Sequence, residues 1–228
     1  MQPNLYETLK MTTNDILIYG AGGFGREMAS LLKRQNAIEP AWNLLGFIDD
    51  DLAKHPVGSR NEYGAILGDC SFLNTYDKPL NVILALGKPA LLKRVYEKIS
   101  NPLIVFPNII GPDAQILDKD NFSMGKGNII CSFTTMSCHV QLGDFNIFNN
   151  RCSVGHDARI GNFNTCMTAT RISGDTRIGD LNFLGVGSIV IQGVHIGNNT
   201  TIGAGSVILH KTKDNALYIG NPAKKVEL

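Results

Sequence analysis

A six-residue repeat of apolar side chains runs through the second half of the chain. Starting at Met124, every sixth position as far as Ile208 is apolar, which makes fifteen positions in succession. Neither the ~3.6-residue period of a helix nor the two-residue period of a strand produces this spacing. The residue that follows the apolar position is glycine in eight cases, at 125, 143, 155, 161, 179, 185, 197 and 203.

The repeat predicts a coil with three flat sides. An inward aliphatic residue, a glycine at a corner and a small residue before the next corner describe one side. Three such units close a turn of 18 residues, so that residues 18 apart stack along one edge. We expect the glycines to supply backbone angles that other residues avoid. Earlier repeats begin at Ile110 and Ile116, and residues 118–121 interrupt the register.

The first half alternates short apolar runs with helical stretches, a pattern typical of a small parallel sheet. We therefore divide the chain into an α/β domain with a Rossmann-like sheet, residues 1–101, and a coiled domain with a C-terminal tail, residues 102–228. The expected strands of the first domain are 16–20, 44–48 and 81–86, and the expected helices are 26–35 and 91–99.

A glycine-rich turn joins the first expected strand to the first helix, with the G-x-G-x-x-G sequence Gly20-Ala21-Gly22-Gly23-Phe24-Gly25. Such a turn lets a phosphate approach the backbone at a helix N-terminus. Asp49 and Asp50 end the second strand, where an acidic residue can hold a ribose or a base. Nicotinamide-dependent dehydrogenases use the same turn, but about 100 residues is short for a full dinucleotide fold. The remainder of the chain is coil repeats instead of a catalytic α/β domain.

Composition excludes several classes of protein. Lysine and arginine exceed aspartate and glutamate by one residue, so no basic surface indicates nucleic acid or anionic lipid as a partner. No apolar run approaches the ~20 residues of a membrane helix. The segment Met1–Asp15 lacks the apolar core of a signal peptide. Five cysteines without a C-x-x-C pair indicate neither a disulfide framework nor a zinc knuckle, so we expect a cytoplasmic, reduced protein.

The pair His156-Asp157 is the strongest catalytic candidate. His156 follows the corner glycine Gly155, so we expect its side chain to point outward from an edge of the coil. A histidine titrates near neutrality and can therefore serve as a general base, and a neighbouring carboxylate can orient its imidazole. Asn149 lies seven residues before His156, and an asparagine at such a position can form a ladder at a coil corner.

His139 lies 17 residues before His156, which raises the alternative of a zinc site like that of γ-class carbonic anhydrases. Catalytic zinc needs three protein ligands, and the next histidine of the coil, His195, lies 39 residues after His156. We therefore expect no metal and assign His139 to the surface or a subunit interface. The role of Lys88 is left open.

The hexapeptide pattern resembles the left-handed parallel β-helix of the hexapeptide-repeat acyltransferases. The segment 154–161, VGHDARIG, resembles their catalytic motif I-x-H-[DE]-x-x-I-G. With the glycine-rich first domain, the chain resembles the sugar O- and N-acyltransferases grouped with sialic acid O-acetyltransferases. It is similar to the bacterial enzymes that acetylate the amino group of nucleotide-linked 4-amino sugars. The resemblance implies an acetyltransferase that uses acetyl-CoA as co-substrate, with His156 as general base. Asn149 matches an asparagine in the family's active-site groove, which implies, as the alternative to a corner ladder, that it donates a hydrogen bond to the substrate or oxyanion.

The resemblance also implies positions for the ligands. In the family, the first domain holds the nucleotide, and coenzyme A lies along the groove between the coiled domains of two neighbouring subunits. A homotrimer with sites between subunits is therefore expected. O-acetylation of a sugar such as sialic acid, and a trimeric scaffold without catalysis, remain alternative functions. The implied diphosphate contacts are Gly20, Gly22, Gly23, Phe24 and Gly25, the implied ribose or base contacts are Asp49 and Asp50, and the implied coenzyme contacts are Gly174, Val186, Ala204 and Lys224.

Overall fold

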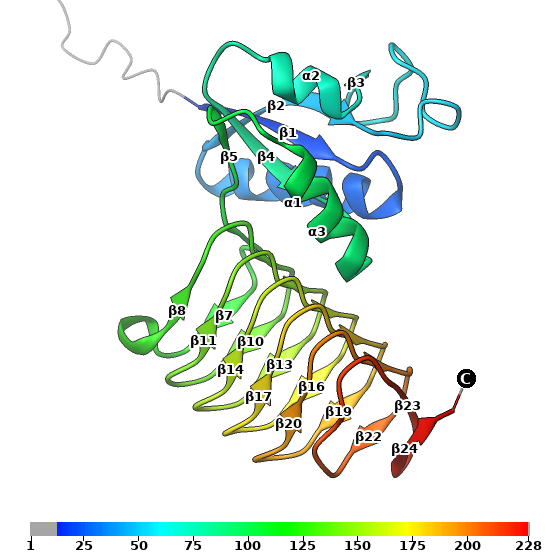
Figure 1. Cartoon of the computed structure of the whole chain (residues 1–228). Coiled ribbons are helices and arrows are strands. Elements are labelled where there is room, and N and C mark those ends of the chain that lie inside the picture. The colour runs from blue at the N-terminus through cyan, green and yellow to red at the C-terminus, as the bar shows by residue number, and fades with distance from the viewer. Residues whose placement is uncertain (1–12, 228) are drawn as a thin grey trace, which may run out of the picture.

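The computed structural model describes residues 13–227, which form an α/β unit stacked on one end of a prism of coils (Figure 1). Residues 1–12 and 228 lie outside the described part, and with them most of the segment Met1–Asp15 that we examined for a signal peptide. Across residues 13–227, no helix combines the length and the apolar character that a membrane crossing requires.

The α/β unit contains a five-stranded parallel sheet in the order β3-β2-β1-β4-β5. The expected α/β domain is confirmed. Three short elements, β3, α2 and β5, were not predicted from the sequence, and β5 continues the sheet beyond the expected boundary at Asn101. The elements are β1 (Asn14–Tyr19), α1 (Gly23–Ile38), β2 (Trp42–Ile48), β3 (Ile66–Gly68), α2 (Cys70–Thr75), β4 (Leu80–Leu84), α3 (Pro89–Lys98) and β5 (Ile104–Val105).

The prism has three faces, each built mainly from a ladder of two-residue parallel strands, which confirms the hexapeptide β-helix. Face 1 comprises β6 (Ile109–Ile110), β9 (Ile129–Ile130), β12 (Ile147–Phe148), β15 (Thr165–Cys166), β18 (Phe183–Leu184), β21 (Thr201–Ile202), β23 (Leu217–Gly220) and the antiparallel β24 (Ala223–Val226). Face 2 comprises β7 (Gln115–Ile116), β10 (Thr135–Met136), β13 (Ser153–Val154), β16 (Arg171–Ile172), β19 (Ile189–Val190) and β22 (Val207–Ile208). Face 3 comprises β8 (Ser123–Met124), β11 (Gln141–Leu142), β14 (Arg159–Ile160), β17 (Arg177–Ile178) and β20 (His195–Ile196).

The predicted 18-residue turn is the register of the ladders, as in the pairing of Leu142 with Ile160. In the first coil the spacing is wider, because Ile110 pairs with Ile130 twenty residues later. The 3₁₀ turn η1 (Lys119–Asn121) lies at the expected interruption and accommodates the extra residues. We call the edge between faces 1 and 2 corner 1/2, that between faces 2 and 3 corner 2/3, and that between faces 3 and 1 corner 3/1.

The glycines that follow the apolar positions have a different role from the one expected. None of those eight glycines has a positive φ, so the expectation of unusual backbone angles is wrong. Instead, a Cβ added to Gly143 would lie 2.4 Å from Oδ1 of Asn162 in the next coil. The positive φ falls two residues after the glycine position, for example at Phe145 (φ 54°) and Asp157 (φ 60°). Glycine is therefore required where successive coils come closest, and the residue two positions later has the backbone angles that turn the chain.

A ladder of buried asparagines closes corner 3/1. Asn128, Asn146 and Asn164 lie 18 residues apart and are fully buried. Asn146 donates from Nδ2 to the carbonyl oxygen of Gly161 (2.8 Å) and to Oδ1 of Asn128 (3.1 Å). Its own Oδ1 accepts from the backbone N–H of Asn164 (3.1 Å). The ladder satisfies backbone groups that the bend of the corner would otherwise leave unpaired.

Replacing Asn146 by alanine should lower the free energy of unfolding by about 2–4 kcal/mol, because it leaves a buried N–H and a buried C=O without partners. Urea unfolding of the full chain measures this loss. The exposed Gln141 on face 3 provides the control, since Gln141→Ala should stay within about 0.5 kcal/mol of wild type. Equal stabilities of the two variants would contradict a structural role for the ladder.

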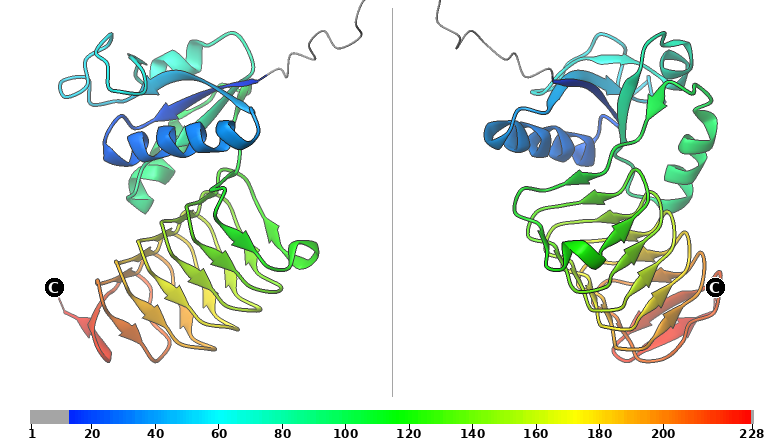
Figure 2. Two further views of the ribbon diagram at one scale, coloured as in Figure 1. Left: turned by 180° about the vertical axis from the view of Figure 1, so that it is seen from behind. Right: turned by 90° about the vertical axis from the view of Figure 1, so that its left-hand side faces the viewer.

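The α/β unit is attached to the first coils through α1 and α3 (Figure 2). Arg34 of α1 donates to Oγ of Ser132 (2.8 Å) and pairs with Asp113. Tyr96 of α3 packs against Phe145, with ring centroids 4.5 Å apart. The buried core of the first sheet continues without a break into the prism, where it includes Ile129 and Ile147. The two halves therefore share one hydrophobic core at their junction.

Candidate active site

His156 and Asp157 occupy corner 2/3 between β13 and β14. Nδ1 of His156 lies 2.8 Å from Oδ2 of Asp157, and the two side chains are 53% and 58% exposed. The backbone holds the pair between coils, because the N–H of Asp157 donates to the carbonyl of Cys138 (2.9 Å) and the carbonyl of His156 accepts from Asp175 (2.7 Å). With Asp157 bound at Nδ1, the free lone pair of the imidazole lies at Nε2 and is available to accept a proton.

Gly174 provides the surface on which the His156 imidazole lies. Gly174 is the residue 18 positions after His156, in the next coil, and it is buried. A Cβ at Gly174 would lie 2.5, 2.6 and 2.8 Å from Nε2, Cε1 and Cδ2 of His156. A real Cβ does not approach other atoms so closely, so the ring can take this position only because residue 174 is glycine. The sequence indicated Gly174 as a coenzyme contact and gave no sign of this one.

Asn149 lies at corner 1/2, directly after β12, and its Oδ1 accepts from the backbone N–H of Asn150 (2.7 Å). Val186 and Ala204 lie at the same corner on later coils and are exposed. Corners 1/2 and 2/3 are the two ends of face 2, separated by five to six residues of extended chain, or roughly 15–20 Å. Within one chain, the candidate residues therefore divide into two groups: Asn149, Val186 and Ala204 at one corner, and His156, Asp157 and Gly174 at the other.

A cavity of about 190 Å³ lies between α1 and corner 1/2. Phe24 and Glu27 line it from the first turns of α1, and Asn149 and Thr165 line it from the prism. Thr165 is 1% exposed, and its hydroxyl has no hydrogen-bond partner among residues 13–227. A buried hydroxyl without a partner is costly unless a ligand or water pairs with it. The remaining residues around the cavity are Gly87, Ile147 and Met167.

The glycine-rich turn lies at the carboxyl end of β1, as expected, and leads into α1. Gly20 has a φ of 106°, and a Cβ at Gly25 would lie 1.8 Å from the carbonyl oxygen of Gly20. These two glycines therefore build the turn itself. Gly22 and Gly23, by contrast, have open space where a Cβ would be. A ligand can thus approach the backbone at the N-terminus of this 16-residue helix.

A basic hollow of about 280 Å³ adjoins the turn, and Arg26, Lys54 and Arg60 line it. Arg26 also pairs with Glu62 at 3.7 Å. Three cations next to a helix N-terminus make an electropositive site that suits phosphate. Sequence reasoning missed Lys54 and Arg60 because they lie in the irregular segment between β2 and β3, where no repeat or motif marks them.

Asp49 and Asp50 lie at the expected end of β2, but their carboxylates have partners within the chain. Asp49 accepts from the backbone N–H of Ala21 (2.8 Å), which fixes the glycine-rich turn. Asp50 accepts from the Tyr19 hydroxyl and from Nζ of Lys98 (3.1 Å). Partial burial acts to raise the pKa of Asp50, but these hydrogen bonds outweigh it and hold the pKa below its usual value. Both carboxylates stabilise the rim of the site, and contact with a ribose or base stays a prediction.

Lys224 is exposed on β24, at the end of the prism remote from the α/β unit. Its neighbour Lys225 pairs with Glu227 at 3.1 Å. Lys88 is the N-cap of α3 and is exposed. His139 is also exposed, at corner 2/3 in the coil before Asp157. In the part of the chain that the structure describes, no three His, Cys, Asp or Glu side chains gather closely enough to hold a metal ion.

Two families match segments of the chain. Residues 15–99 match the family described as PglD N-terminal domain, and residues 175–210 match the family described as bacterial transferase hexapeptide (six repeats). In sequence, the chain is 32% identical over 143 residues to the GDP-perosamine N-acetyltransferase of Escherichia coli O157:H7. The matched stretch spans 62% of this chain and 62% of that relative's length.

Solved structures match the whole architecture. The acetyltransferase domain of PglB from Neisseria gonorrhoeae FA1090, in complex with acetyl coenzyme A, superposes with a TM-score of 0.83 at 27% identity. That match covers 94% of this chain and 100% of the other. PerB from Caulobacter crescentus, in complex with CoA and GDP-perosamine, gives a TM-score of 0.80 at 26% identity and covers 95% and 99% of the two chains. The chain therefore consists of a PglD-type N-terminal domain followed by a prism of bacterial transferase hexapeptide repeats, the architecture that it shares with these sugar N-acetyltransferases.

Proposed function

We propose that this protein transfers the acetyl group of acetyl-CoA to the amino group of a nucleotide-linked amino sugar. The observation that carries the proposal is the exposed His156–Asp157 pair at corner 2/3, with its Nδ1···Oδ2 distance of 2.8 Å. Relatives in complex with acetyl coenzyme A, and with CoA and GDP-perosamine, supply the two substrate classes.

His156 acts as the general base. Its Nε2 removes a proton from the sugar amine as the nitrogen attacks the thioester carbonyl, and the carbonyl carbon becomes tetrahedral. Collapse of this intermediate breaks the C–S bond and releases coenzyme A as a thiolate, which takes the proton back from the imidazolium. Asp157 stabilises the imidazolium between these steps without being protonated itself.

The active site is completed by a second copy of the chain. All the candidate residues serve one reaction only if corner 1/2 of one copy meets corner 2/3 of another, since a single chain separates them by the width of face 2. Such an interface joins two different surfaces, and it must be repeated around a ring to close. For a three-sided prism, a ring of three copies with face 2 turned inward satisfies both corners. We therefore propose a homotrimer with three equivalent sites.

The nucleotide sugar lies along the first turns of α1. Its diphosphate fits the basic hollow beside Gly22 and Gly23, and the sugar fits the 190 Å³ cavity, where a sugar hydroxyl can pair with Thr165. Asn149 lines that cavity and can hold the sugar near the neighbouring copy's base. The five cysteines are all free, which fits the cytoplasm, where acetyl-CoA is also available.

The experiment that tests the function is a thiol-release assay with acetyl-CoA against UDP-, GDP-, dTDP- and CMP-linked sugars. GDP-perosamine is the first acceptor to try, because it is the substrate in the names of two relatives. Each nucleotide is offered with a 4-amino sugar and with its hydroxyl counterpart. Release that depends on the amine supports the proposal, whereas release with the hydroxyl sugars alone would make the protein an O-acetyltransferase.

Gly22→Val should abolish binding of the nucleotide without unfolding the chain. A Cβ at Gly22 meets no atom within 4 Å, so the added side chain occupies the space where the phosphate approaches. Calorimetric titration with the preferred nucleoside diphosphate measures the change. Ala90→Val, exposed in α3, is the matched control and should bind like wild type. Wild-type affinity in Gly22→Val would contradict the position of the diphosphate.

A further inference from the structure

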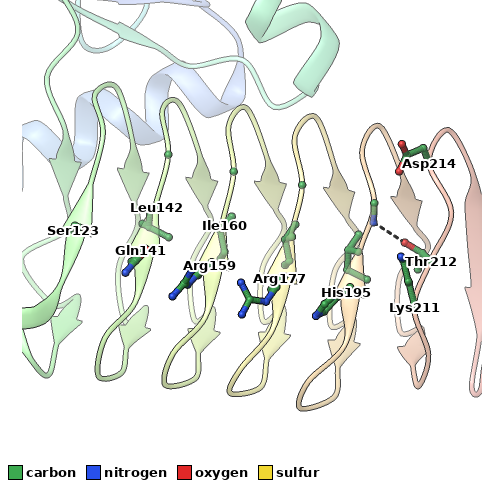
Figure 3. A pocket seen from close by; sticks show the side chains of 16 residues that line it. Ser123, Gln141, Leu142, Arg159, Ile160, Arg177, His195, Lys211, Thr212 and Asp214 are labelled. Carbon is green, nitrogen blue, oxygen red and sulfur yellow. Dashed lines mark hydrogen bonds between the residues drawn. The ribbon is translucent and has the colours of Figure 1, made fainter.

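A hollow of about 700 Å³ runs along face 3, outside the candidate residues described so far (Figure 3). Its floor follows the outward row of the face, where Gln141, Arg159, Arg177 and His195 stand one above another on successive strands. Lys211, after the last coil of this row, continues the series toward the C-terminal end. The hollow therefore contains a column of cationic and hydrogen-bond-donating groups parallel to the prism axis.

The cations of this column have no anionic partners within the described residues 13–227. Arg159, Arg177 and Lys211 are exposed, and none of them lies within 4.0 Å of a carboxylate. Asp214 also lines the hollow, but its carboxylate accepts from the backbone N–H and the amide of Asn198 (2.8 and 3.4 Å). Unpaired cations in a row make a surface that suits a ligand with several phosphate groups.

The column runs beside corner 2/3, where the proposed base lies. Each corner residue of the series is followed three residues later by a residue of the column, so that His156 precedes Arg159 and Gly174 precedes Arg177. In the proposed trimer, the groove between two copies has face 1 of one copy and face 3 of the next as its outer walls. The cationic hollow then opens into the groove that leads to His156.

The height of each cation above His156 can be compared with the length of coenzyme A. Successive coils are ~4.8 Å apart, so Arg177, His195 and Lys211 lie about 5, 10 and 14 Å beyond the coil of His156. The pantetheine arm contains two amide units and spans about as much as five extended residues, roughly 17 Å. With the thioester at His156, the phosphates of coenzyme A reach the upper part of the column, where His195 and Lys211 lie. Arg159 lies at the level of the acetyl group, and Arg177 lies beside the pantetheine arm.

We propose that His195 and Lys211 bind the phosphate groups at the nucleotide end of acetyl-CoA. The inference rests on the proposed function, because it uses the thioester at His156 and the groove between copies. The nucleotide sugar is the other source of phosphate, but the proposed function assigns its diphosphate to the basic hollow beside the glycine-rich turn, at the opposite end of the molecule.

Calorimetric titration of the full chain with coenzyme A tests the proposal without needing an acceptor sugar. We compare the wild type, His195→Gln/Lys211→Gln, and Arg159→Gln as the matched control on the same face. The double variant should bind coenzyme A at least tenfold more weakly than wild type. With 3′-dephospho-coenzyme A, which lacks one phosphate group, the affinities of wild type and double variant should differ by a smaller factor. A charged contact is worth about tenfold in affinity, which sets the loss expected in the double variant. The affinity of Arg159→Gln for coenzyme A should stay within about twofold of wild type, because Arg159 lies away from the phosphates.

The outcomes separate the two proposals. If wild type does not bind coenzyme A at all, the proposed function fails and this inference fails with it. If wild type binds coenzyme A and the double variant binds it equally well, only the phosphate site is wrong. An equal loss in Arg159→Gln would also overturn the inference, because it would show a general effect of positive charge on face 3. The same variants are also titrated with a nucleoside diphosphate. If the double variant loses affinity for the nucleoside diphosphate and keeps its affinity for coenzyme A, the column binds the nucleotide sugar and the inference is wrong.

Discussion

Replacing His156 by alanine should lower kcat by about 10²–10⁴-fold, the usual effect of removing a general base. The side chain lies on the outside of corner 2/3, away from the stacked aliphatic core, so its loss leaves no cavity and the prism should stay folded. Coenzyme A binding should change little, because it does not depend on the imidazole. Steady-state rates of thiol release, with circular dichroism as the check on folding, measure both expectations.

Two neighbouring variants sharpen the result for His156. Asp157→Asn should cost less, because it weakens the orientation of the imidazole and the stabilisation of its charged form without removing the base. His139 is an exposed histidine at the same corner, and His139→Ala should change kcat only slightly. The loss of kcat in His156→Ala should also become smaller as the pH rises, because an amine acceptor then deprotonates without a base. Wild-type turnover in His156→Ala would remove the general-base assignment.

Gly174→Ala should lower kcat by about 10–100-fold, although residue 174 carries no reactive group. The new methyl would require space now occupied by three atoms of the His156 ring, at distances of 2.5–2.8 Å, so the imidazole must move. A displacement of about 1 Å in a reacting group is enough to cost about 100-fold. The affinity for coenzyme A, measured by calorimetry, should fall by a smaller factor than kcat does.

A double-mutant cycle identifies the cause of this loss. Once His156 is alanine, the methyl at residue 174 has no ring to displace, so adding Gly174→Ala to His156→Ala should have no further effect on the residual rate. If Gly174 instead contacts only the pantetheine arm, the KM for acetyl-CoA should rise by the same factor in both backgrounds. That pattern would contradict a positioning role for Gly174.

The prism could be predicted from the sequence because a six-residue period has few structural solutions, and each repeat restates it. The same six-residue period also determines the corner of the prism at which each residue lies. Asn149 and His156 lie seven residues apart in a coil that turns a corner every six residues, so they belong to different corners. Their separation follows from this spacing, and it supports the proposal that the site lies between two copies of the chain.

Other features could not be predicted because they depend on contacts between distant segments. Lys54 and Arg60 reach the glycine-rich turn through an irregular loop, which carries no periodic signal. Tyr19 and Lys98 bind the carboxylate of Asp50 from two other elements, and no motif marks these contacts, whereas the contact of Asp50 with a ribose or base stays a prediction. The space that Gly174 leaves for an imidazole is visible only when two coils are stacked.

The central claim, a site built from two copies of the chain, is tested most directly by mixing two inactive variants. Gly22→Val disables the nucleotide side of the site and His156→Ala disables the base, so trimers of either variant alone should be nearly inactive. In trimers co-expressed from both, a functional site forms where the base of a Gly22→Val chain meets the nucleotide side of a His156→Ala chain. Random assembly gives this combination at about one quarter of the interfaces. We therefore expect thiol release at about one quarter of the wild-type rate. A rate no higher than the mean of the two pure variants would show that each chain contains its own complete site.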